Sequence, residues 1–133
     1  KSDALESYKK VGKQELINTR DPATLIKMLF DKACLLLRTS INSLSENQKD
    51  PFHKSSLHAL QIIISLRFVL DTSANDQLSK NLFDTYTSIA ASLFKAKEDE
   101  DIVALSKIYE ALDELRGAWE ILLSKPNQDE RER

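Results

Sequence analysis

The segment "LHALQIIISLRFVLD" spans residues 57–71 and holds nine large apolar side chains and one alanine in fifteen positions. It is too short and too interrupted to cross a membrane, which takes about 20 predominantly apolar residues. We expect a helix here, and one buried helix face would use only about half of these apolar side chains. The remaining apolar side chains need a second explanation.

At about 100° per residue, the segment divides into two apolar stripes. We favour the first stripe as the inward one, because the small side chain of Ala59 lets a neighbouring helix approach closely; it comprises Ala59, Ile62, Ile63, Leu66 and Leu70. The second stripe, centred roughly half a turn away, comprises Leu57, Leu60, Ile64 and Phe68. It is then expected to face away from the core. A surface stripe of this size needs a cover, which the N-terminal segment, another subunit or a bound partner would supply.

The rest of the chain has few residues that break helices. Two glycines and three prolines in 133 residues predict an almost entirely helical protein. Aspartate precedes proline at 21–22 and at 50–51, a pattern typical of a helix cap followed by the first turn. The acidic run 98–101 is interpreted as capping a further helix. We therefore predict helices over 22–46, 51–72, 76–97 and 99–123, and an all-α, antiparallel four-helix bundle.

The length fits one domain. We assign residues 21–124 to the bundle, residues 1–20 to a short N-terminal cap segment, and residues 125–133 to a disordered polar tail. The N-terminal segment has too few apolar residues for a fifth bundle helix, but Leu5, Tyr8 and Val11 give it a weak apolar face that can dock on another surface.

Two bundle helices have more apolar side chains than one face needs. Met28 and Leu35 lie opposite the main stripe of 22–46, and Phe83 and Phe94 widen the stripe of 76–97.

The composition excludes several classes of function. A net charge of −2 argues against a nucleic-acid-binding protein. There is no glycine-rich phosphate loop, no Glu-x-x-His pair, and no histidine pair at the spacing of helical metal ligands. Cys34 lies in an apolar helix and is interpreted as a packing residue. We expect no catalytic residues, no cofactor, no metal and no membrane insertion. In the absence of a signal-peptide pattern we expect a cytoplasmic protein.

Five blocks along residues 4–123 resemble the flagellar export chaperone family FliS, in the same order and at similar spacing. They are "ALESYKKV" (4–11), "DPATLIKMLFDKA" (21–33), "ALQIIISLRFVLD" (59–71), "LSKNLFDTYTSI" (78–89) and "DIVALSKIYEALDELRGAWEILL" (101–123). The most specific features are Tyr8, the proline block at 22–29, Asn-Leu-x-x-x-Tyr at 81–86 and Ala-Trp at 118–119.

The resemblance implies a chaperone in the bacterial cytosol, and not an enzyme. Its partner would be the disordered C-terminal region of flagellin, which such chaperones keep from polymerising and deliver to the flagellar type III export apparatus. The second stripe, Leu57, Leu60, Ile64 and Phe68, has the spacing of a groove for a client helix. Leu5, Tyr8 and Val11 match the family's N-terminal segment, which implies a cap over that groove and contact with the export gate.

Two alternatives stay open at this point. The first is a generic helical adaptor whose exposed stripe is a homodimer interface, and a homodimer without client is compatible with the chaperone as well. The second is a bundle enzyme or ligand-binding protein, whose chemistry the sequence lacks.

Overall fold

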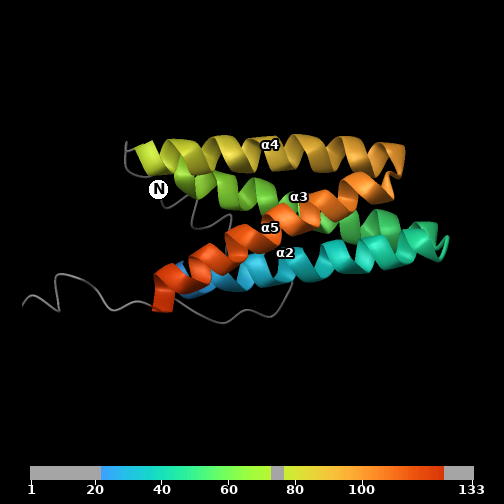
Figure 1. Cartoon of the computed structure of the whole chain (residues 1–133), viewed down its shortest axis with the longest axis horizontal. Helices are drawn as coiled ribbons and strands as arrows, with labels where there is room; N and C mark the ends of the chain where they lie inside the picture. Colours follow the sequence, from blue (N-terminus) through green and yellow to red (C-terminus); the bar gives the residue numbers. More distant parts are fainter. Residues whose placement is uncertain (1–21, 73–76, 125–133) are drawn as a thin grey trace, which may run out of the picture.

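The computed structural model of the chain describes residues 22–72 and 77–124, and these residues form four α-helices (Figure 1). The helices are α2 (Pro22–Ser45), α3 (Lys49–Thr72), α4 (Gln77–Asp99) and α5 (Ile102–Ser124). The predicted all-α four-helix bundle is confirmed. The predicted cap segment 1–20 and tail 125–133 lie outside the described residues.

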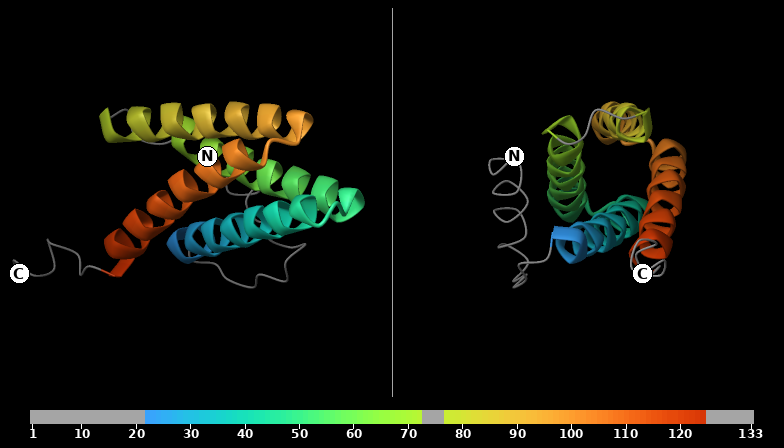
Figure 2. Two further views of the ribbon diagram at one scale, coloured as in Figure 1. Left: turned by 45° about the vertical axis from the view of Figure 1, so that its right-hand side comes forward. Right: turned by 90° about the vertical axis from the view of Figure 1, so that its left-hand side faces the viewer.

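The four helices surround a common interior, with α3 opposite α5 and α4 opposite α2 (Figure 2, right). Contacts join α2 to α3, α3 to α4, α4 to α5, and α5 back to α2. Successive helices run in opposite directions (Figure 1). The pairs α2–α5 and α3–α4 therefore form two opposite sides of the bundle, a relationship that matters for the functional surfaces below.

The helix starts are close to those expected from the sequence. Pro22 is the first residue of α2, where its missing N–H removes no hydrogen bond. Helix α3 begins at Lys49, two residues earlier than predicted, and the N–H of Phe52 donates to the carbonyl of Gln48 at 3.2 Å. Asp50 therefore lies within the first turn, where its negative charge interacts favourably with the helix dipole. It does not act as an N-cap residue preceding the helix.

Two turns of the bundle use left-handed residues that are not glycine. Asn47 ends α2 with φ of 58°, and the N–H of Gln48 donates to the carbonyl of Ser43 at 2.8 Å. Glu100 ends α4 in the same way, with φ of 51°. Asn tolerates this conformation, whereas for most other residues it costs about 1–2 kcal/mol. The side chain of Asp101 then accepts a hydrogen bond from the N–H of Ala104 at 3.1 Å, which confirms that the acidic run caps α5.

All four helices contribute to one apolar core. Four members of the predicted inward stripe of α3 are confirmed, since Ala59, Ile62, Ile63 and Leu66 are each no more than 1% exposed. The side chain of Leu70 lies outside the described part. Small side chains bring α3 close to α2: Ser40 of α2 faces Ser55 of α3, and their hydroxyl oxygens are 2.8 Å apart. Both hydroxyls also bond to carbonyls of their own helices, so these buried polar groups are satisfied.

An aromatic cluster links three helices. Phe30 of α2 makes an edge-to-face contact with Tyr86 of α4, with ring centroids 5.9 Å apart, and its centroid lies 6.2 Å from that of Trp119 of α5. The indole N–H of Trp119 donates to the hydroxyl of Tyr86 at 2.8 Å. Tyr86 is only 2% exposed, and its burial raises its pKa to about 12. The cluster is structural, and it brings together two of the most specific sequence features, the tyrosine at 86 and the tryptophan at 119.

We predict that Tyr86→Phe lowers the free energy of unfolding by about 1 kcal/mol at neutral pH, because the indole N–H of Trp119 loses its acceptor. The same change should reduce the loss of stability in alkali. The unfolded chain releases the tyrosine proton near pH 10, whereas the folded state holds it to about pH 12. Stability that is complete below pH 10 is therefore lost as the pH rises toward 12.

Urea denaturation at neutral pH and at about pH 11, inside this window, measures both effects. Fluorescence of Trp119, the single tryptophan, is a suitable signal. An alkaline loss of stability as large in Tyr86→Phe as in the wild type would contradict the assignment of that loss to Tyr86.

Candidate functional site

The predicted client-binding residues of α3 do not all lie on its outer side. Leu57 is 46% exposed, and Ile64 is partly buried against the core. Leu60 is only 9% exposed and belongs to the core. The expectation that Leu60 lies on the outward face is therefore wrong. The side chain of Phe68 lies outside the part of α3 that is described in detail.

The burial of Leu60 has a simple geometric cause. Leu60 follows Leu57 by three residues, which places it about 60° around the helix from Leu57. A contact of Arg67 shows which neighbouring helix lies on that side. Arg67, one heptad beyond Leu60, places its guanidinium 4.9 Å from the ring centroid of Phe83 on α4. Leu60 therefore lies on the side of α3 that α4 covers.

Two contacts fix the register between the antiparallel helices α3 and α4. Arg67 lies over Phe83 near one end, and Lys49 and His53 approach Glu100 at the other. Because the two helices are antiparallel, each residue forward along α3 between these points corresponds to one residue back along α4. This register places Leu57 at the level of Phe94, which is 56% exposed.

Phe94 also lies on the edge of α4 that is nearest to α3. It follows Phe83 by eleven residues, or slightly more than three helical turns, so the two rings share one side of α4. We call the surface formed by Leu57, Ile64, Phe83 and Phe94 the α3–α4 face. The sequence indicated Phe94 only as a broadening of the core stripe, since a single helix pattern does not show which neighbour its flanks meet.

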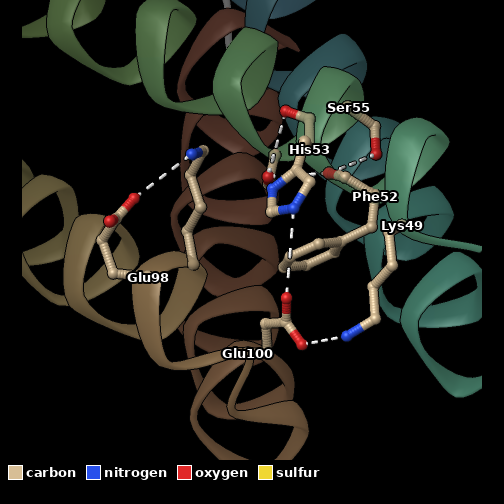
Figure 3. A network of polar contacts seen from close by, with 8 residues as sticks. Lys49, Phe52, His53, Ser55, Glu98 and Glu100 are labelled. Atoms are coloured by element: carbon tan, nitrogen blue, oxygen red, sulfur yellow. Dashed lines mark hydrogen bonds and ion pairs between the residues drawn. The ribbon is translucent and has the colours of Figure 1, made fainter. Parts of the chain in front are cut away.

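Charged side chains border one end of the α3–α4 face (Figure 3). The Lys49 ammonium forms an ion pair with Glu100, and His53 Nε2 lies 3.9 Å from the same carboxylate. Lys97 and Glu98 form a further pair at 3.5 Å. An apolar strip with a charged border is the surface that an amphipathic helix fits when it lays its apolar side into a groove.

The remaining predicted site types can be compared with the described residues. Within 22–72 and 77–124, no three His, Cys, Asp or Glu side chains are grouped as a metal site requires. None of the four described helices has the length and apolar character of a membrane span. Cys34 is 5% exposed, and burial raises the pKa of its thiol to about 11, so the thiol is protonated at neutral pH. Leu5, Tyr8 and Val11 lie outside the described residues.

We predict opposite effects for two neighbouring substitutions on α3. Leu60→Asp buries a carboxylate in the core and should lower the free energy of unfolding by about 3 kcal/mol or more. Leu57→Asp places the same group on the surface and should change it by less than about 1 kcal/mol. Urea denaturation of both variants measures the difference. Equal destabilisation would contradict the distinction between the buried and the exposed leucine.

Comparisons with known proteins agree with this architecture. The profile of the family described as flagellar protein FliS matches residues 4–126. The flagellar secretion chaperone FliS of Escherichia coli (strain K12) is 24% identical over 123 residues, covering 92% of this chain and 90% of its own. The flagellar secretion chaperone FliS of Vibrio cholerae serotype O1 is 26% identical over 117 residues, covering 88% of this chain and 86% of its own. With a family match over most of its length, this four-helix chain belongs to the FliS family of flagellar secretion chaperones.

Proposed function

We propose that this chain is a cytoplasmic chaperone that binds the disordered C-terminal region of flagellin. It keeps flagellin from polymerising prematurely and delivers it to the flagellar type III export apparatus, without a cofactor. The observation that supports this proposal best is the exposed α3–α4 face on a chain of the FliS family. A chaperone of this kind needs apolar surface at helical spacing, because its client supplies the missing half of the interface.

The client contact is proposed through Leu57, Ile64 and Phe68 of α3, as the sequence suggested, with Phe94 of α4 added. Leu60 supports the surface from beneath. Full burial of a leucine or phenylalanine side chain contributes about 1.5–3 kcal/mol. Folding of the client upon binding opposes this gain by about 2–5 kcal/mol or more. The α3–α4 face alone therefore gives moderate affinity, and we expect the client to contact further surface.

We predict that Leu57→Asp and Phe94→Asp each weaken binding of a peptide from the flagellin C-terminal region by about tenfold or more, since each places a charge against the client's apolar side. Titration calorimetry measures the affinity. Val103→Asp is the matched control: it adds the same charge at a side chain that is 66% exposed on α5, and it should leave the affinity unchanged.

Two outcomes would contradict different parts of the proposal. Failure of the wild type to bind any flagellin peptide would reject the flagellin client. Binding that is equally strong in the wild type and in both α3–α4 variants would reject the α3–α4 face as its site. Light scattering tests the homodimer alternative, which predicts a stable dimer whose mass does not respond to the peptide.

The N-terminal residues Leu5, Tyr8 and Val11 are proposed to cover part of this apolar surface without client and to contact the export gate. Deletion of residues 1–18 should then increase the fluorescence of a dye that binds exposed apolar surface. The effect should disappear in a variant that also carries Leu57→Asp and Phe94→Asp, because these remove the apolar surface. Unchanged dye fluorescence after the deletion would argue against a cap.

A further inference from the structure

The α3–α4 face has a defined length, because charged side chains follow the apolar ones at both of its ends. Along α4 the face runs from Phe94 to Phe83, which are eleven residues or about 16 Å apart at 1.5 Å per residue. Along α3, Leu57 lies at the level of Phe94, and Arg67 lies over the ring of Phe83. The register of the two helices therefore gives both of them the same two end points.

At the first end, the next residues in line are polar or charged (Figure 3). One helical turn beyond Leu57 lies His53, whose Nε2 is 3.9 Å from the carboxylate of Glu100. One turn beyond Phe94 lies Glu98, whose side chain is 56% exposed. An apolar side chain of a partner placed on these groups would remove water from them, which opposes binding. The apolar surface therefore stops at Leu57 and Phe94.

The second end is bordered by two cations. The guanidinium of Arg67 lies 4.9 Å from the ring centroid of Phe83. Lys80 is exposed and lies three residues before Phe83, so the two side chains are neighbours on α4. On α3, the position eleven residues after Leu57 is Phe68, which the register places at the level of Phe83. The apolar positions of both helices thus end at one level.

The middle of the face can be covered by apolar side chains. Ala90 is 8% exposed and lies in line between the two rings of α4, seven residues after Phe83. Thr87 is exposed, and its hydroxyl already donates to the carbonyl of Phe83 at 2.8 Å. Ile64 lies at the level of Thr87 in the register of α3 against α4. An apolar cover over Thr87 therefore leaves its hydroxyl donor satisfied.

We propose that the α3–α4 face accepts one helical segment of three turns, about 11–12 residues, with large apolar side chains at i, i+4, i+7 and i+11. This inference rests on the proposed function, and it specifies the part of the client that the face takes. A helix lying along α4 has the same rise per residue, so its apolar side chains meet the levels of Phe94, Ala90, Thr87 and Phe83 in turn. The spacing reads the same in both directions, so it holds for either orientation of the client. A segment of this length is at most marginally helical in water and becomes helical on the face.

Three synthetic peptides of equal length, about 20 residues with a background of serine and glutamine, test this footprint. They carry leucine on one helix face at three positions (i to i+7), four positions (i to i+11) or six positions (i to i+18). In titration calorimetry the fourth leucine should tighten binding about tenfold, because it buries a further side chain. The fifth and sixth should add about twofold at most, because they only provide a second register. A peptide with four leucines spread around the helix should bind weakly.

Two protein variants locate the effect. In Phe94→Asp the peptides with three and four leucines should bind equally, because one end of the face is now charged. Leu35→Asp is the matched control, since Leu35 is 53% exposed on α2, opposite the buried stripe as the sequence predicted. Helix α2 belongs to the other side of the bundle (Figure 2). In this control the fourth leucine should keep its tenfold effect.

Several results would overturn the three-turn footprint. Equal gains from the fourth, fifth and sixth leucines would show that the face is longer, and a fourth-leucine gain that survives in Phe94→Asp would place the peptide elsewhere. Binding of a flagellin C-terminal peptide, but of no leucine peptide, would reject the footprint and leave the proposed function standing. The reverse result would reject flagellin as the client and leave the footprint standing, and binding of neither would reject both.

Discussion

The hydrogen bond from Trp119 to Tyr86 joins α5 to α4 where the backbones of these two helices lie apart. Helices α4 and α5 leave their connecting turn at a wide angle and separate along their length (Figure 1; Figure 2, left). Tyr86 lies in the half of α4 far from that turn, and Trp119 lies in the corresponding half of α5. Their 2.8 Å contact, with Phe30 of α2 against both rings, joins α4 to α5 through the core at a distance from the turn. Large aromatic side chains suit this place because each fills much volume and the hydroxyl of Tyr86 accepts the hydrogen bond of the indole N–H of Trp119. Through this junction, α2, α4 and α5 share one packed aromatic cluster.

The overall fold was predictable because it rests on local information. Scarce glycine and proline, the apolar stripes and the acidic run before α5 act within one helix or one turn, and they agree with the structure. The inward stripe of α3 was predictable for a similar reason, since Ala59 favours close contact on its side. The placement of Leu60 was not, because the width of a buried helix face depends on how neighbouring helices flank it. Leu60 and Leu57 look alike in the sequence, and only the position of α4 distinguishes them.

The exposure of Phe94 was also not predictable from the pattern of its own helix. In the sequence it widens a core stripe, yet in the structure it is 56% exposed at the level of Leu57. The pairing of these two residues depends on the register of α3 against α4, which contacts far apart in the sequence determine. Likewise, Leu35 and Arg38 lie three residues apart on α2, but the surface pocket that they line also includes Tyr109 and Arg116 of α5. Surface sites on a helical bundle form between two helices, so the pattern within one helix reveals only the residues that this helix contributes.

The charged border of the α3–α4 face has a role beyond its own stability. A surface ion pair such as Lys49–Glu100 contributes at most about 1 kcal/mol. Glu100 also occupies a left-handed backbone conformation that costs a similar amount. The net gain in stability is therefore small, and the main effect of the Lys49–Glu100 ion pair is to position two parts of the bundle. It joins the α4–α5 turn to the start of α3, while Arg67 and Phe83 join the same two helices near their other ends. These two contacts set the register that places Leu57 and Phe94 at the same level. A face whose register is set before binding spends less free energy on ordering itself, which would favour binding of the proposed client.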